Sequence, residues 1–344
     1  MFERILVTGA SGRLGSNLAK RLSERGAKVR AFVLPDDPAE KTLTGLNVEI
    51  FYGDLRDEIA VEEAVEGCDA IAHCAAVMGL PKNMTPHTFF DINCRGSFNV
   101  FQAASEKADK IRRLVYLSST SAYSVETTGP VITEDDTLTP PSLYGMTKIV
   151  NEAMLRTFRY QTGLKAVVLR PNFIMACDEI LNGWRRPWVT GVLQRADERY
   201  TCYVPGVAEP WKIVEEAVPD PETRVIPFGP GRRPWTWHVT DVRDTVHAVE
   251  CALENEKAIG ETFCIAGPKP ARWDEVVKHL CKRLDEEYVE VDLPNLWHFE
   301  FDLTKAGNVL GYDPQYSPVR MIDDAIAFRN GKNIDVIPPA IAHG

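Results

Sequence analysis

Short apolar runs alternate with amphipathic stretches through the first half of the chain, and this alternation limits the fold more than any other feature. Continuous apolar runs are typical of strands that are buried on both faces of a parallel sheet. The stretches between them repeat apolar residues every three to four positions, which is typical of helices. The pattern predicts an α/β fold with a doubly wound parallel sheet. The expected strands are 5–7, 29–33, 48–52, 70–73, 114–117 and 166–169, and the expected helices are about 14–25, 58–66, 95–108 and 145–161.

The alternation stops after Arg170-Pro171. Residues 175–237 are rich in tryptophan and carry eight of the 23 prolines. A helix at about 241–254 and a strand at 262–265 are expected to return to the sheet, and helices and loops are expected over 267–330. The second half is therefore predicted to be a smaller region interleaved with the sheet, and not a separate domain on a linker.

Composition excludes several classes of partner. The 49 acidic residues outnumber the 39 basic ones, and a net negative charge repels a nucleic-acid backbone. No apolar run reaches the roughly 18 residues of a membrane span, and the N-terminus lacks the pattern of a secretory signal. Neither the eight cysteines nor the seven histidines have the spacing of a metal site. We expect a cytoplasmic protein with buried thiols and with no metal, nucleic-acid or membrane partner.

Three glycines stand where the first expected strand meets the first expected helix, in Thr8-Gly9-Ala10-Ser11-Gly12-Arg13-Leu14-Gly15. Glycines at this junction allow a tight turn and bring backbone N–H groups close to a pyrophosphate at the positive end of the helix. An ordinary glycine-rich turn is the alternative, but the position at a strand-to-helix junction favours dinucleotide binding. The loop residues expected to contact the cofactor are Gly9, Ser11, Gly12, Arg13, Leu14 and Gly15.

Other segments fit the same ligand. Asp54, followed by Leu55, comes after the third strand, where its carboxylate can accept from the adenine amino group, although alone it would suit a helix cap. Ala75 and Ala76 follow the fourth strand and leave room for a ribose, or simply allow close packing.

The 2′ position of the adenosine ribose can be read in two ways. Asp36, near the end of the second strand, favours a free 2′-OH and therefore NAD. Arg13 in the loop could instead bind the 2′-phosphate of NADP. We prefer NAD and keep NADP open.

Tyr144 and Lys148 are four residues apart and lie on the same face of the helix that they begin. A neighbouring ammonium group lowers the pKa of a phenol and helps to make it a usable base. Upstream, Ser119 and Thr120 belong to a hydroxyl cluster after the strand at 114–117, at the edge where doubly wound sheets bind ligands. The pair and the cluster together predict a site for proton transfer.

In this order, the motifs resemble the extended branch of the short-chain dehydrogenase/reductase superfamily, which includes NAD-dependent epimerases and dehydratases. The branch's T-G-x-x-G-x-x-G loop matches residues 8–15, its N-x-x-G-[TS] segment matches Asn93–Ser97, and its late H-V-x-D-V segment matches 238–242. The resemblance implies a Rossmann domain at 1–174 and about 236–266. It also implies a substrate-binding region at 175–235 and 267–344.

The resemblance further implies roles for single residues. Tyr144 would transfer the proton, Lys148 would orient the nicotinamide ribose, and Thr120 would bind the reacting oxygen, with Ser119 as the alternative. Asn93 and Pro171 would lie along the cofactor. A homodimer through the helices at 95–108 and 145–161 is also implied, with apolar positions Phe98, Phe101, Met154, Leu155 and Phe158.

One departure concerns the substrate. The family often continues R-P-x-N-V-Y-G-P, whereas here Asn172 falls one position early and the Y-G-P is missing, which puts a nucleotide diphosphate in doubt. Trp184, Arg185 and Arg186 follow, and such residues suit a polyhydroxylated or anionic small molecule. A packed, proline-rich surface loop is the alternative for this segment.

These observations predict an NAD(P)-dependent oxidoreductase that transfers hydride at a secondary alcohol or ketone of a sugar or sugar-like substrate. Net dehydrogenation, reduction and epimerisation all fit. Dehydration is less favoured, because Ser121-Ala122 stands where dehydratases of this kind often carry Asp-Glu. The alternative is a non-catalytic regulatory or structural homologue, which would usually have lost the tyrosine or the lysine.

Overall fold

A seven-stranded parallel sheet forms the centre of the computed structural model, which describes residues 2–78, 84–123, 131–198, 209–294 and 296–340. The strand order is β12-β6-β5-β4-β1-β2-β3, and every neighbouring pair is parallel. The doubly wound sheet is confirmed. Its strands are β1 (Arg4–Thr8), β2 (Lys28–Val33), β3 (Val48–Tyr52), β4 (Ala70–His73), β5 (Arg113–Leu117), β6 (Ala166–Pro171) and β12 (Thr262–Ile265).

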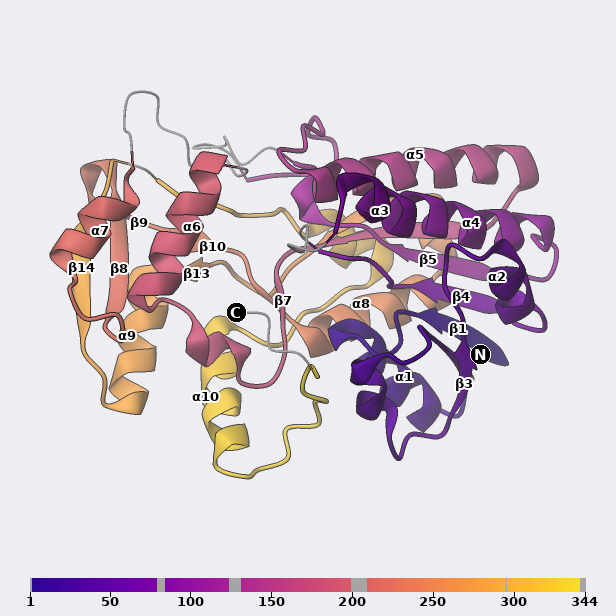
Figure 1. Ribbon diagram of the computed structural model, residues 1–344, viewed down its shortest axis with the longest axis horizontal. Coiled ribbons are helices and arrows are strands. Elements are labelled where there is room, and N and C mark those ends of the chain that lie inside the picture. Colours follow the sequence, from indigo (N-terminus) through magenta and orange to yellow (C-terminus); the bar gives the residue numbers. More distant parts are fainter. Residues whose placement is uncertain (1, 79–83, 124–130, 199–208, 295, 341–344) are drawn as a thin grey trace.

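Helices cover both faces of the sheet, which explains why its central strands are almost wholly apolar. In Figure 1, α2, α4 and α5 lie above the sheet, and α1 and α8 lie below it. Each layer closes its own buried core against the strands. We call the sheet and these helices the sheet lobe. Its helices are α1 (Arg13–Glu24), α2 (Glu58–Val65), α3 (Pro86–Phe90), α4 (Gly96–Glu106), α5 (Leu143–Thr162) and α8 (Val242–Glu254).

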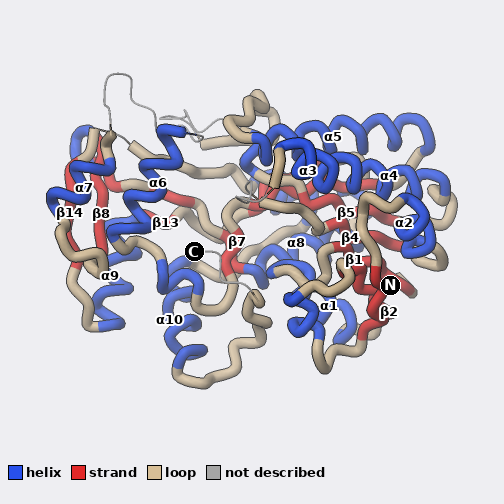
Figure 2. The backbone as a smooth tube through the Cα atoms, viewed as in Figure 1, coloured by secondary structure: helices blue, strands red, loops and turns tan. Residues whose placement is uncertain are grey.

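A second core gathers most of the tryptophans at the other end of the molecule, and we call this part the tryptophan lobe. Trp184, Trp235 and Trp273 are its largest fully buried side chains. Figure 2 shows its strands standing apart from those of the central sheet. Its elements are α6 (Arg186–Glu198), α7 (Trp211–Ala217), α9 (Trp273–Leu284), α10 (Pro318–Arg329), β8 (Arg224–Gly229), β9 (Arg233–Pro234) and β14 (Tyr288–Asp292).

The tryptophan lobe contains a three-stranded sheet, ordered β14-β8-β9. Its strand β14 is a correction to the expectation of helices and loops over 267–330. Strand β14 alternates exposed and covered residues at the edge of this sheet, so it lacks the apolar run of a buried strand. Strand β8 contains Pro227, which argues against a strand when only the sequence is read.

Two short strand pairs join the lobes. Strand β7 (Ile174–Met175) pairs with β11 (Thr240–Asp241), and β10 (Thr236–Trp237) pairs with β13 (Ala271–Arg272). The chain therefore passes between the lobes several times. In the part of the chain that the structure describes, no helix is both long and apolar enough to cross a bilayer.

Candidate active site

The loop between β1 and α1 is packed so closely that two of its glycines have no room for a side chain. A Cβ on Gly9, where φ is +63°, would lie 2.7 Å from Cα of Ala75, and a Cβ on Gly15 would lie 2.0 Å from the carbonyl oxygen of Gly9. Helix α1 begins at Gly12 with no side-chain cap, so its first N–H groups stay available at the positive end of the helix. This loop fits a phosphate-bearing ligand.

Arg13 and Asp36 are the two charged residues expected to contact the adenosine end of the cofactor. Neither lies in the surroundings that were expected. Arg13 donates to both carboxylate oxygens of Glu179 at 2.8 and 2.5 Å, so its guanidinium already has an anionic partner. Asp36 is exposed, whereas Asp37 accepts from the Ser11 hydroxyl at 2.5 Å. The carboxylate that faces the glycine loop is therefore that of Asp37. The sequence offered both neighbouring acids and we preferred Asp36, although Asp37-Pro38 is a typical start for a short helix, and Asp37 does cap one.

Two other expected cofactor residues are held by neighbours. Asp54 accepts from Arg56, whose hydrogen bonds lower the pKa of this carboxyl. Asp54 does not cap α2, because Asp57 does so. Leu55 packs against Gly96, where a Cβ would lie 2.9 Å from that of Leu55.

Small residues and amides shape the ends of β4 and β6. Ala75 makes the close approach to Gly9 described above, and Ala76 is half-buried beside it. Asn93 is buried and holds both the N–H and the C=O of Val77, at 2.8 and 3.0 Å, so it fixes the segment after β4. Leu14 is buried in the core, and Pro171 ends β6.

Tyr144 and Lys148 lie side by side at the start of α5. Ser142 caps this helix by accepting from the N–H of Gly145 at 3.1 Å. Gly145 itself presses on the hydroxyl segment, since a Cβ there would lie 2.0 Å from the carbonyl oxygen of Ser121. The ammonium group of Lys148 lies 5.4 Å from the ring centroid of Tyr144. The expected pair is therefore placed next to the expected hydroxyls.

Lys148 is a buried cation. Its Nζ donates to the carbonyl oxygen of Leu117 at 2.7 Å and lies 5.1 Å from the ring centroid of Tyr116. Burial lowers the pKa of Lys148 to about 8. This pKa leaves a mostly protonated ammonium at neutral pH that can shed its proton in a mildly basic solution.

The two hydroxyl candidates divide into different tasks. The N–H of Ser121 donates to the Ser119 hydroxyl at 3.1 Å, so Ser119 caps the turn after β5. Thr120 donates to Oδ1 of Asn172 at 2.7 Å, and Nδ2 of Asn172 donates to the carbonyl oxygen of His238 at 2.7 Å. Both ends of the Asn172 amide are thus used within the protein, and Asn172 orients Thr120.

A sequence profile of the NAD dependent epimerase/dehydratase family matches residues 5–182, more than half of the chain. The chain belongs to this family. The resemblance drawn from the motifs is confirmed.

Relatives and solved structures agree with this assignment. Sterol demethylase protein B of Methylococcus capsulatus is 35% identical over 208 residues, covering 58% of this chain and 60% of that protein. Uronate dehydrogenase of Pseudomonas putida is 31% identical over 173 residues, covering 49% and 60%. The chain thus spans less than two thirds of the length of both relatives. A short-chain dehydrogenase/reductase superfamily protein from Agrobacterium tumefaciens with bound NAD superposes with a TM-score of 0.81 at 26% identity, over 96% of this chain and 98% of that one.

Beneath the site of this epimerase/dehydratase family member lies a buried polar chain that sequence reasoning missed. His73 contacts the Thr8 hydroxyl through Nδ1 at 2.7 Å and the Ser97 hydroxyl through Nε2 at 2.9 Å. Asn151 continues it, donating to Ser97 and to the Tyr116 hydroxyl, both at 2.9 Å. Because Ser97 donates to a backbone carbonyl, the network assigns the proton to Nε2 of His73. The sequence offered one sign of this network, which was the ionisable residue His73 at the end of the buried strand β4.

A buried ion pair was also missed. Arg170 at the end of β6 pairs with Glu152 of α5 at 2.7 Å, and Glu152 accepts from Ser118 at 2.5 Å. Arg170 also donates to the Tyr123 hydroxyl at 2.5 Å. Its pKa is raised by Glu152 and Tyr123 against the opposing effect of burial. The pair fixes α5, and with it Tyr144, against the strand ends.

The side chains of the Trp/Arg segment are held by partners in the tryptophan lobe. Arg185 pairs with Glu222 and Glu286, and Arg186 donates to the carbonyl oxygen of Pro219 at 2.8 Å, all within the tryptophan lobe. Trp184 is 1% exposed in the core of that lobe. These contacts give the two guanidinium groups partners inside the protein and bury the indole, so they do not support a direct role of these three residues in substrate binding, which stays a prediction.

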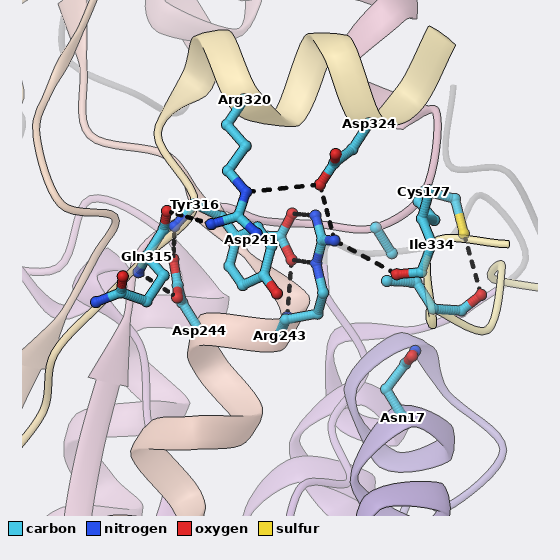
Figure 3. A network of polar contacts seen from close by, with 12 residues as sticks. Asn17, Cys177, Asp241, Arg243, Asp244, Gln315, Tyr316, Arg320, Asp324 and Ile334 are labelled. Carbon is cyan, nitrogen blue, oxygen red and sulfur yellow. Dashed lines mark hydrogen bonds and ion pairs between the residues drawn. The ribbon is translucent and has the colours of Figure 1, made fainter. Parts of the chain in front are cut away.

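A polar network beside the glycine loop joins the lobes (Figure 3). Arg243, at the start of α8, pairs with Asp241 at 2.8 Å and with Asp324 of α10 at 2.9 Å. Its guanidinium lies 3.6 Å from the ring centroid of Tyr316. Further along, the backbone of Ile337 exchanges two hydrogen bonds with the Asn17 side chain of α1, at 2.8 and 3.0 Å. The end of the described chain is thereby attached to the first helix.

Proposed function

We propose that the protein is an NAD-dependent oxidoreductase of the epimerase/dehydratase type. It transfers hydride at a secondary alcohol or ketone of a sugar or sugar-like substrate. The observation that carries this proposal is the placement of Tyr144 and Lys148 together at the start of α5, against the segment that holds Thr120. Retention of both residues in this arrangement favours an enzyme over a non-catalytic homologue.

The residues of the glycine loop fit the cofactor. The N–H groups at the start of α1 would hold the pyrophosphate, and the Asp37 carboxylate would accept from the adenosine ribose. An acidic residue there and an Arg13 engaged by Glu179 support NAD over NADP. When bound, NAD supplies the hydride acceptor or donor. The Agrobacterium structure with bound NAD supports the same choice.

The catalytic side chains would divide the proton chemistry. Tyr144 takes the hydroxyl proton of the alcohol, or returns it to the ketone oxygen. Lys148 places a positive charge beside the phenol and so favours its ionised form. Thr120 donates to Asn172 in this structure. With substrate bound, its hydroxyl would donate to the reacting oxygen instead, while the proton of that oxygen passes to Tyr144.

A simple experiment tests the activity. The full chain is incubated with NAD and a panel of galacturonate, UDP-glucuronate and cyclic alcohols, and NADH absorbance is followed. Tyr144→Phe should reduce kcat at least about 100-fold while changing the Kd for NAD less than about twofold. A Tyr144→Phe variant with wild-type turnover would show that the catalytic assignment is wrong. NAD released on denaturing the purified protein would favour epimerisation over net dehydrogenation.

We further propose that the protein works as a cytoplasmic homodimer. Phe98 of α4 is 39% exposed and packs on Phe158 of α5, with ring centroids 5.4 Å apart. Phe101 and Leu155 are buried against the sheet, so they do not contribute to this surface. Cys202 lies outside the described residues, and the other seven cysteines are free thiols, which suits a reducing compartment.

A further inference from the structure

Three exposed apolar side chains follow strand ends at the edge of the proposed site or directly precede Tyr144. Met78 follows β4 and is 56% exposed, Phe173 follows β6 and is 43% exposed, and Leu143 directly precedes Tyr144 and is 42% exposed. Strands β4, β5 and β6 are neighbours in the sheet, so their carboxyl ends meet at one edge. Thr120 comes after the middle strand. Exposed apolar side chains that gather at a site point to an apolar ligand.

Phe173 is held in place at a conformational cost. Its φ is 31°, a value that bulky residues rarely adopt. The preceding Asn172 is fixed by Thr120 and by the carbonyl oxygen of His238. Strain of this kind persists where the surrounding structure imposes it, and it is concentrated at functional sites. Phe173 therefore directly follows the residue that accepts from the Thr120 hydroxyl.

An aromatic wall continues from Phe173 into the tryptophan lobe. The ring centroids of Phe173 and Trp237 are 3.9 Å apart, and those of Trp237 and Trp188 are 5.4 Å apart. Trp273 supports this wall from behind, 5.3 Å from Trp188. Phe173 is exposed, Trp188 is half-buried and Trp237 is buried. None of these side chains carries a charge.

The two arginines that could have balanced a diphosphate are engaged elsewhere. Arg185 is held by Glu222 and Glu286, and Arg186 by backbone carbonyl oxygens. A nucleotide diphosphate bound against this wall would contact uncharged aromatic rings, and no arginine of this segment would be available to pair with its negative charges.

We propose that the ring bearing the reacting carbon is extended by an apolar, ring-containing body, as in a hydroxylated fused-ring alicycle, which packs on Phe173 and the wall behind it. This inference rests on the hydride transfer proposed above and goes beyond it, because it places an apolar body where a sugar would have a polar one. Oxidation of the secondary alcohol gives a ketone: the carbon loses its hydride to NAD⁺, and the hydroxyl proton passes to Tyr144 and then to water.

The test compares substrates that undergo the same alcohol oxidation but differ in the polarity of the rest of the molecule. The probes are androsterone and epiandrosterone, which differ only in the stereochemistry of the reacting alcohol, set against UDP-glucuronate and galacturonate. We expect NAD-dependent oxidation of one steroid epimer, with a kcat/KM at least about tenfold above that of either sugar. Phe173→Ala should raise the steroid KM at least about tenfold and leave kcat within about threefold, because burial of one aromatic ring on the ligand is lost.

Two variants serve as controls. Phe173→Tyr keeps the ring and should restore the steroid KM. Tyr288→Ala removes a similarly exposed aromatic ring, 39% exposed on β14 of the tryptophan lobe, and should leave the steroid KM unchanged. An equal rise of KM in Tyr288→Ala and Phe173→Ala would overturn the proposal.

A binding measurement separates this inference from the proposed function. In Tyr144→Phe with NAD, steroid binding is followed by quenching of tryptophan fluorescence. Steroid binding that depends on Phe173, with no turnover of any probe by the native protein, would support the apolar site and count against the oxidoreductase. Turnover of a sugar probe that depends on Tyr144, with no steroid binding, would leave the oxidoreductase standing and overturn the apolar site. Absence of steroid binding in every assay overturns it as well.

Discussion

The Lys148 ammonium, only 2% exposed, has a pKa lowered to about 8 by burial. An ordinary lysine keeps its charge until about pH 10.4, so this one loses its charge at a lower pH. We expect the Kd for NAD to rise at least about threefold between about pH 7 and about pH 9, because the neutral amine holds a ribose hydroxyl less well. Fluorescence titration with NAD measures this change. The pH dependence should disappear in Lys148→Ala, and a flat native profile would contradict the prediction.

The two adjacent aspartates after β2 allow a matched comparison. Asp37 faces the glycine loop through Ser11, whereas Asp36 is exposed. Asp37→Ser should weaken NAD binding about tenfold and reduce the preference for NAD over NADP, since it removes a charged acceptor. Asp36→Ser should leave both values unchanged. Calorimetric titration of each variant with both nucleotides decides between them, and the reverse result would restore Asp36 to the site.

Motifs that depend on backbone shape or on helical spacing could be predicted residue by residue. Gly9 and Gly15 have no room for a side chain, and Tyr144 with Lys148 needs only one turn of helix. Side chains whose direction depends on distant partners could not be predicted. The direction of Arg185 depends on Glu286, a hundred residues away in the chain.

At the scale of elements, the His73 chain joins three strands, β1, β4 and β5, to two helices, α4 and α5. Burial lowers the pKa of His73 to about 3. Below about pH 6.5 this histidine therefore binds a proton in the unfolded chain but not in the native protein. The free energy of unfolding falls as the pH drops from about 6.5 towards 3. We expect His73→Leu to lower the free energy of unfolding at pH 7 by about 2–4 kcal/mol, because Thr8 and Ser97 lose a buried partner. Urea unfolding at several pH values measures both effects, and the acid slope should be shallower in the variant.

The face made by α4 and α5 gives a prediction about assembly. A charge at Phe98 would be buried without a partner if this face is the dimer interface, so Phe98→Glu should yield monomers at micromolar concentration. Ile59→Glu, on the exposed face of α2, should leave the native assembly unchanged. Light scattering after size-exclusion chromatography reports the mass. A native protein that is already monomeric would show that the dimer proposal is wrong.

Elements of the sheet lobe were predictable because the burial of each one requires a recognisable pattern of apolar residues in its sequence. Strand β5 is buried throughout, and α1 presents one apolar face to the core. Strand β14 has acidic residues at alternate positions and lies at the edge of a small sheet, and β8 contains Pro227. These two strands pair with each other and pack on the tryptophan core. No local sequence pattern predicts this pairing.

At the scale of the whole molecule, Arg243 links the lobes through Asp241 and Asp324. Asp241 is 4% exposed, so removal of the guanidinium leaves a buried carboxylate without its cation. Arg243→Met should lower the free energy of unfolding by about 3–5 kcal/mol. Arg320→Met, at the exposed edge of the same network, should lower it by less than about 1 kcal/mol. Urea denaturation of both variants tests this difference, and equal losses would mean that the network acts only as a surface cluster.

The hydrogen bonds between Asn17 and Ile337 join residues that are 320 positions apart. They have a consequence for biosynthesis. During translation, α1 leaves the ribosome long before its partner exists, and β6 waits for β12 to cover its outer side. Until residues 262–265 emerge, the nascent sheet exposes an apolar edge of the kind that pairs with other chains. Emergence of residues 262–265, and not the appearance of the glycine loop, therefore sets the moment at which β6 stops presenting an unpaired edge to other chains.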